Sequence, residues 1–210
     1  MTAVIRFARE EDAEQIAEIY APFVRHTPVS FEMEPPTPAQ MGQRVQEVLM
    51  RLPWLVCAGA EQEVMGYVYA SPHRLRAAYQ WSVDVAIYID ARYRRAGVGR
   101  ALYTSLFEVL RLQGYYNAYA GITLPNEASV GLHEAIGFVP VGVYRSVGYK
   151  LGTWHDVGWW QLPLLPRATP ESDPLPLGAI RDTEAGRAAL AAGLPFLRNA
   201  FPSSVSSTQG

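Results

Sequence analysis

Residues Ser82–Arg100, SVDVAIYIDARYRRAGVGR, decide the fold, because an alternating segment is followed there by a glycine-containing loop and a helical repeat. Residues alternate with period two from Ser82 to Ile89, which predicts a strand. One face of this strand carries Val83, Val85, Ile87 and Ile89. Asp84 lies on the opposite face and is the only acidic residue within the strand. The stretch therefore predicts a strand, a loop and a helix in direct succession.

The loop has the chemistry of an anion site. A helix start presents unpaired backbone N–H groups and the positive end of the helix dipole, and glycines let a phosphate approach the backbone closely. A nucleotide-binding P-loop pattern is absent, and a dinucleotide-binding fingerprint would need a third glycine where Leu102 stands. What remains is Arg-x-x-Gly-x-Gly at Arg94, Gly97 and Gly99, which fits a pyrophosphate. Ordinary turn chemistry before a helix is the alternative interpretation.

Composition limits the class of protein. The chain has 210 residues and a formal net charge of −2, which favours one globular domain with an extension and gives no overall nucleic-acid or membrane signal. The single cysteine, Cys57, favours a reducing compartment, and its apolar surroundings favour a buried residue over a nucleophile. No signal peptide or membrane-spanning run is found. No cluster has the spacing of metal ligands, so we expect no metal. These features predict a cytoplasmic protein.

The remaining elements follow from periodicity and caps. A strand at residues 4–8, helices starting near Glu10 and after Thr37, and a strand pair at 54–60 and 64–71 precede the central stretch. A strand at 117–123, a short helix capped by Asn126 and ended by Gly137, and two strands near 138–149 and 157–164 follow it. The order β-α-α-β-β-β-α-β-α-β-β predicts a mixed α/β fold.

This order, the loop, Asn126 and Gly137-Phe138 resemble the GNAT N-acetyltransferase superfamily over about residues 3–165. Further segments are similar to its phosphinothricin and methionine sulfoximine acetyltransferases: Trp54-Leu55-Val56, Ala78–Trp81, Leu124-Pro125-Asn126, Leu132–Ala135 and, most specifically, Gly152–Gly158. The resemblance implies a central mixed sheet of about seven strands, splayed between strands 4 and 5 and flanked by helices. It also implies a homodimer and transfer of acetyl from acetyl-CoA to the amino group of a small amino-acid-like substrate.

The resemblance assigns the coenzyme site. It implies that acetyl-CoA contacts backbone groups of the splayed strand, the glycine loop and Asn126. The predicted coenzyme-binding residues are Ile87, Tyr88, Ile89, Arg94, Arg95, Ala96, Gly97, Val98, Gly99, Arg100 and Asn126.

Two residues are the predicted catalytic groups. An ammonium group must lose a proton before it attacks, and Asp84 is the candidate base, directly or through water. The related family has a glutamate at this position, one methylene longer, which favours the water-mediated route. Pairing of Asp84 with Arg74 or Arg76 is the structural alternative. His133 stands where the wider superfamily usually has a tyrosine, and it is predicted to protonate the leaving sulfur or to position the substrate. A purely packing role on the helix surface is its alternative.

Acceptor recognition is predicted from charge and aromatic residues. Arg74 and Arg76 precede the central strand and resemble the carboxylate clamp of the family. Phe31, Tyr79 and Trp81 are candidate walls of the acceptor site, although core packing also explains aromatic residues. Trp154-His155-Asp156 fits either the acceptor pocket or a dimer interface.

The last part of the chain, residues 166–210, lies outside the resemblance. It begins as a proline-rich linker, contains a possible short helix at 182–192 and shows no sign of chemistry of its own. The predicted boundaries are therefore a catalytic domain over 1–165 and an extension over 166–210. Two other functions stay open: acetylation of another amine or of a protein N-terminus, and coenzyme binding without catalysis.

Overall fold

The computed structural model describes residues 3–170 and 172–198. They form a mixed α/β structure around one seven-stranded sheet of order β1-β2-β3-β4-β5-β7-β6. The strands are β1 (Val4–Phe7), β2 (Trp54–Ala58), β3 (Val64–Pro72), β4 (Ser82–Ile89), β5 (Asn117–Leu124), β6 (Val139–Lys150) and β7 (Thr153–Pro163). All neighbours are antiparallel except β4 and β5, which run parallel. The predicted fold class is confirmed.

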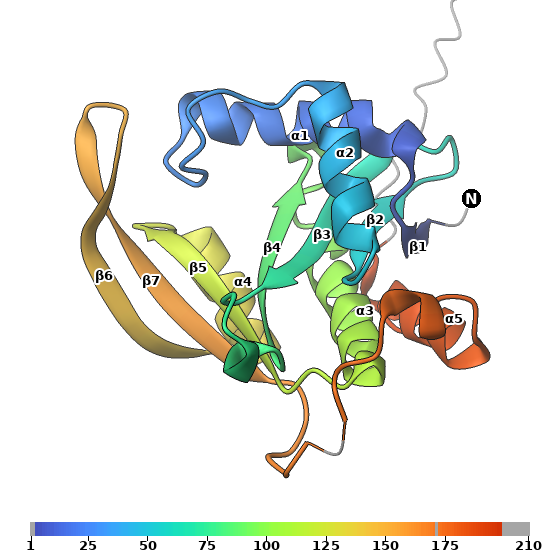
Figure 1. Cartoon of the computed structure of the whole chain (residues 1–210). Coiled ribbons are helices and arrows are strands. Elements are labelled where there is room, and N and C mark those ends of the chain that lie inside the picture. The colour runs from blue at the N-terminus through green and yellow to red at the C-terminus, as the bar shows by residue number, and fades with distance from the viewer. Residues whose placement is uncertain (1–2, 171, 199–210) are drawn as a thin grey trace, which may run out of the picture.

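The helices cover both faces of the sheet (Figure 1). They are α1 (Ala13–His26), α2 (Pro38–Leu49), α3 (Val98–Gln113), α4 (Glu127–Ile136) and α5 (Glu184–Ala191). Short 3-10 turns lie at Glu10–Asp12, Ala77–Tyr79, Ala91–Tyr93, Leu177–Ala179 and Leu194–Phe196. None of the helices in the described part of the chain is both long and apolar enough to cross a membrane.

Local sequence signals account for the helix ends. The Thr37 hydroxyl accepts a hydrogen bond from the Gln40 N–H, and the Gln40 side chain accepts one from the Thr37 N–H, so the predicted capping box is confirmed. The Asn126 side chain accepts from the Ser129 N–H and starts α4, as predicted. Gly114 and Gly137 end α3 and α4 with positive φ angles of 88° and 110°.

The two faces of β4 have different surroundings. Val83 and Val85 are buried against α3 in the larger core cluster, which also contains Leu102, Leu106 and Leu110. Asp84 and Tyr88 face the side covered by α1 and α2, where a second cluster includes Trp54 and Tyr67. Cys57 is completely buried, and burial raises the pKa of its thiol to about 12, so it is no nucleophile at neutral pH.

Candidate active site

The glycine loop lies between β4 and α3, and its backbone opens the helix with free donors. Gly97 adopts a left-handed conformation with φ 84° and ψ −4°, which glycine tolerates far better than other residues. Within residues 3–170 and 172–198, the N–H groups of Gly97, Val98, Gly99 and Arg100 have no hydrogen-bond acceptor. Because the helix dipole adds positive potential at the same place, this turn can bind an anionic group.

The sheet opens beside this loop. The parallel pairing of β4 with β5 comprises Ser82 with Asn117, Val83 with Ala118 and Asp84 with Tyr119, and it ends there. From Val85 to Ile89, β4 stays paired only with β3 on its other edge. Figure 1 shows the two strands separating toward α1. Asp84 therefore lies at the point where the strands part, and the edge of β4 beyond it is free.

A small cavity of about 60 Å³ occupies the gap between the strands. Its wall includes four of the predicted site residues, Ile87, Tyr88, Asn126 and His133. Tyr103 of α3 lines the same cavity, although the sequence analysis did not single it out. The structure thus brings the unpaired strand, the start of α4 and the two polar side chains of Tyr103 and His133 together.

His133 is buried, not exposed on the helix surface, with a relative exposure of 3%. Its Nδ1 lies 2.7 Å from the carbonyl oxygen of Ser129, which can only accept, so Nδ1 carries the proton. Burial lowers the pKa of His133, which keeps the ring neutral at pH 7. Its Nε2 is then an acceptor for the Tyr103 hydroxyl, 2.8 Å away. In this arrangement His133 holds the Tyr103 hydroxyl in place, and both of its ring nitrogens are engaged.

Asp84 pairs with His73, a residue that the sequence analysis did not select. The Asp84 Oδ1 lies 2.6 Å from the His73 Nδ1, which donates when the carboxylate is ionised. Burial raises the pKa of Asp84, while the hydrogen bond and the charge of His73 oppose that rise. The structure therefore replaces the considered pairing of Asp84 with Arg74 or Arg76 by a carboxylate–imidazole pair.

Some of the predicted acceptor residues gather around this pair. The Tyr79 ring meets the His73 ring edge-on at 5.8 Å, and His73 stacks on Tyr119 at 4.4 Å. Arg74 donates to the His73 carbonyl oxygen, and its guanidinium carbon lies 5.7 Å from the centre of the Trp159 ring. Asp84 thus lies in a polar cluster with an exposed arginine at its edge.

Other predicted acceptor residues lie elsewhere. The Arg76 side chain is exposed and forms no hydrogen bond or ion pair within the described residues. The Trp81 indole N–H donates to the Ser172 carbonyl oxygen, so this residue holds the extension. Of the Trp154–Asp156 segment, Trp154 is exposed, while Asp156 binds Arg145 and the Ser146 N–H. These contacts belong to the β6–β7 hairpin.

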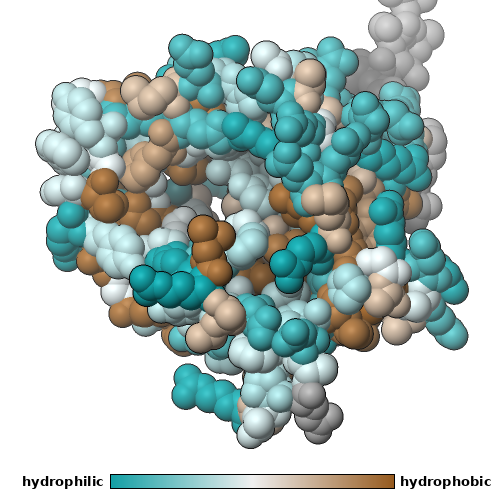
Figure 2. Space-filling view, in the orientation of Figure 1, coloured by the Kyte–Doolittle hydropathy of each residue, from teal (hydrophilic) through white to brown (hydrophobic). Residues whose placement is uncertain are grey.

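Phe31 and Lys150 connect the α1–α2 segment to the β6–β7 hairpin over the gap between β4 and β5, and we call these contacts the Phe31–Lys150 arch. A Cβ atom placed on Gly148 of β6 would lie 2.2 Å from the Phe31 ring, so the ring lies directly against the hairpin backbone. The buried Lys150 Nζ donates to the carbonyl oxygens of Val24 and Ser30, both at 2.6 Å. These contacts join the α1–α2 connection to the hairpin. Figure 2 shows the hollow that remains beneath α1, between the hairpin and the β3–β4 part of the sheet.

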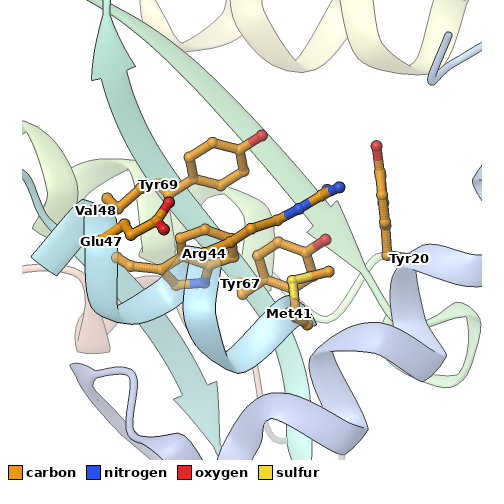
Figure 3. A pocket seen from close by; sticks show the side chains of 8 residues that line it. Tyr20, Met41, Arg44, Glu47, Val48, Tyr67 and Tyr69 are labelled. Carbon is orange, nitrogen blue, oxygen red and sulfur yellow. The ribbon is translucent and has the colours of Figure 1, made fainter. Parts of the chain in front are cut away.

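A second cavity of about 170 Å³ lies on the same face of the sheet as Asp84. Tyr69 lines it and pairs with Ala86, two residues or about 7 Å along β4 from Asp84. Figure 3 shows Arg44 reaching across this cavity toward Tyr20, beside Tyr67 and Tyr69. Glu32 neutralises Arg44 through two hydrogen bonds of 2.7 and 2.9 Å. The cavity is therefore aromatic, and its wall also carries an arginine paired with Glu32 and the carboxylate of Glu47.

The residues missed by the sequence analysis share one cause. His73, Tyr103 and Lys150 acquire their positions from the register of a strand pair or from helix packing. Only the antiparallel pairing of Ser71 with Asp84 brings the residue that follows β3, His73, beside the carboxylate. The sequence signal available for His73 was that it is a polar residue close to the end of a strand. Without the register of β3 on β4, that signal does not identify it as the partner of Asp84.

Comparison with known proteins decides the family. A family model described as an acetyltransferase (GNAT) domain matches residues 5–159. The chain belongs to the GNAT acetyltransferase family. The phosphinothricin N-acetyltransferase of Streptomyces viridochromogenes is 41% identical over 167 residues, 78% of this chain and 91% of that protein. The L-methionine sulfoximine/L-methionine sulfone acetyltransferase of Salmonella typhimurium is 30% identical, covering 80% of this chain and 98% of its own length.

A solved GNAT structure supports the same assignment. The phosphinothricin acetyltransferase of Sinorhizobium meliloti in complex with AcCoA superposes with a TM-score of 0.75 at 32% sequence identity. The match covers 83% of this chain and 98% of that one. Membership in the GNAT family makes the protein an N-acetyltransferase.

Proposed function

We propose that this GNAT protein transfers the acetyl group of acetyl-CoA to the primary amino group of a small amino-acid-like acceptor. The acceptor class is that of phosphinothricin, methionine sulfoximine or methionine sulfone, as the names of the relatives indicate. One observation carries the proposal: β4 loses its partner strand directly after Asp84, on the strand that leads into a helix start with free N–H groups. The carboxylate and the anion site are thus joined by one unpaired strand edge.

The residues present fit acetyl-CoA. The diphosphate would accept from the N–H groups of Gly97, Val98, Gly99 and Arg100, and Arg94 and Arg95 are exposed beside the same loop. The unpaired edge from Val85 to Ile89 offers backbone groups to the amide-containing arm of the coenzyme. Asn126 lines the gap and, in this proposal, contacts the coenzyme while its side chain caps α4.

Asp84 is the proposed base. It takes a proton from the acceptor ammonium, directly or through one water molecule, and the amine nitrogen then bonds to the thioester carbonyl carbon. The carbon–sulfur bond breaks as the thiolate leaves. His73 keeps the carboxylate oriented through its Nδ1–H, and backbone N–H groups near Ile87–Ile89 stabilise the carbonyl oxygen as charge builds on it. His133 acts by positioning the Tyr103 hydroxyl in the gap.

The acceptor would occupy the face of the sheet beneath the Phe31–Lys150 arch. Arg74 is the proposed partner of its carboxylate, because a guanidinium binds a carboxylate with two parallel hydrogen bonds. Tyr79 forms a wall beside His73. The aromatic cavity along β4 from Asp84 would take the apolar part of the acceptor side chain.

Two further proposals concern the state of the protein. The outer strands expose a set of large apolar side chains, which supports a homodimer formed through this surface: Val139, Val141, Val143, Tyr144, Val147, Tyr149 and Trp154. A cytoplasmic location stays a prediction that rests on the single, buried cysteine.

A thiol-release assay with a panel of amines tests the function. We expect release of coenzyme thiol with phosphinothricin, methionine sulfoximine or methionine sulfone at a kcat/KM at least about 100-fold above that with spermidine or a peptide N-terminus, because only the first group offers Arg74 an adjacent carboxylate. Higher rates with spermidine or the peptide would assign another acceptor. Stabilisation by acetyl-CoA without thiol release from any amine would instead support a non-catalytic coenzyme-binding protein.

A further inference from the structure

The C-terminal extension packs on the helix that begins at the glycine loop. Leu177 and Ile180 are buried in the main core, and α5 lies beside α3 (Figure 1). This part of the chain follows the residues 5–159 that match the family model. The extension thus lies outside the part of the chain that the family model matches, and its last described residues reach the glycine loop.

Close backbone contacts fix this arrangement. The Ser105 hydroxyl of α3 donates to the Leu190 carbonyl oxygen and accepts from the Gly193 N–H, at 2.8 and 3.1 Å. A Cβ atom on Gly193 would lie 1.9 Å from the Ala101 carbonyl oxygen, so only glycine allows this approach. Residues 193–198 are therefore anchored on the first half of α3.

From this anchor, residues 193–198 touch the glycine loop itself. The Arg198 N–H donates to the Ala96 carbonyl oxygen at 3.0 Å. The Phe196 carbonyl oxygen lies only 2.0 Å from the position that a Cβ atom on Gly97 would occupy. The Phe196 ring centre lies 4.3 Å from the guanidinium carbon of Arg100. None of these contacts uses the N–H groups of Gly97, Val98, Gly99 or Arg100 as donors within the described residues.

We propose that residues 193–198 are a positioning element for the coenzyme: they hold the Ala96-Gly97 backbone and the Arg100 guanidinium in the arrangement that binds the diphosphate of acetyl-CoA. This inference rests on the proposed function. A loop that is held in its binding conformation before the ligand arrives loses less conformational entropy on binding. The extension thereby raises the affinity for acetyl-CoA. It takes no part in the chemical step, which occurs at Asp84 on β4.

The test uses two glycine-to-alanine variants within the extension of the full-length protein. In Gly193→Ala the new methyl group meets the α3 backbone and must displace residues 193–198, whereas in Gly178→Ala nothing lies within 4 Å of the new atom. We expect Gly193→Ala to raise the Kd and KM for acetyl-CoA about ten-fold with kcat at saturation within two-fold of wild type. Gly178→Ala should bind like the wild type. Calorimetric titration with acetyl-CoA alone provides a readout that does not depend on catalysis.

A second variant keeps the test decisive if Gly193→Ala folds poorly. Phe196→Ala removes the half-buried ring that packs on Arg100 and on the edge of the main core, without the backbone collision of Gly193→Ala, and should raise the Kd for acetyl-CoA about three-fold, the range of a cation–π contact. Equal Kd values for wild type and Gly193→Ala, or for wild type and Phe196→Ala, would overturn the inference, as would a fall in kcat with an unchanged Kd. A wild-type protein that does not bind acetyl-CoA would refute the proposed function instead.

Discussion

Asp84→Asn is expected to lower kcat about 100- to 1,000-fold, the usual contribution of a general base, while the Kd for acetyl-CoA stays within two-fold of wild type. The amide has the shape of the carboxylate but accepts no proton. Steady-state rates at saturating acetyl-CoA and acceptor, together with calorimetric titration of the coenzyme, measure the two quantities. Glu108→Gln on α3 is a matched loss of one charge, from a surface pair with Arg111, and should leave kcat unchanged.

The pH profile gives an independent view of the same carboxylate. Because burial raises the pKa of Asp84 above its ordinary value of 3.8, the acid-side fall in kcat/KM should lie above that pH, and it should disappear in Asp84→Asn.

A raised pKa also means that the stabilising contribution of Asp84 is present below pH 3.8 and is lost as pH rises through the folded-state pKa. At pH 7 the Asn variant should therefore melt no earlier than wild type. An Asn variant with normal kcat would remove Asp84 from its role.

The second large effect is expected at the glycine loop. Gly97→Ala should raise the Kd for acetyl-CoA about 30-fold, because strain at a left-handed backbone position costs about 1–3 kcal/mol and each 1.4 kcal/mol is a ten-fold change in affinity. The alanine methyl would also collide with the Phe196 carbonyl oxygen. The loop must shift to relieve the backbone strain and the collision. Its N–H groups then no longer point together toward the diphosphate. Calorimetric titration with acetyl-CoA measures the change.

Gly114→Ala is the matched control for this prediction. Gly114 has a similar φ of 88° at the opposite end of α3, with nothing within 4 Å of an added Cβ atom. Both variants should lose unfolding free energy through backbone strain, Gly97→Ala more than Gly114→Ala because of its added collision with Phe196, and only Gly97→Ala should lose coenzyme affinity. A Kd that is unchanged in Gly97→Ala, or raised equally in both variants, would show that the loop does not bind the coenzyme.

Local signals were sufficient for the elements that surround the proposed coenzyme site. Period-two alternation gave β4 with its observed bounds, Ser82–Ile89, and the spacing of Gly97 and Gly99 correctly marked the start of α3. The cap at Asn126 is a contact between residues three positions apart. Such features depend on short stretches of chain, which is why the sequence predicts them well.

The polar partners of the site could not be predicted in the same way. The His73–Asp84 pair requires the register of β3 on β4, and the bond between Tyr103 and His133 requires the packing of α3 against α4. Lys150 reaches Val24 and Ser30 over more than a hundred residues of chain. The approach of Phe196 to Gly97 joins the extension to the loop at a similar distance along the chain. No local pattern encodes these long-range contacts.

A crystal structure of the protein with bound acetyl-CoA tests the central claim most directly. We expect the diphosphate within hydrogen-bond distance of the N–H groups of Gly97, Val98, Gly99 and Arg100, and the thioester between β4 and β5 beside Asp84. A coenzyme bound elsewhere, with these N–H groups engaged by the protein's own chain and the strand gap filled by side chains, would contradict it.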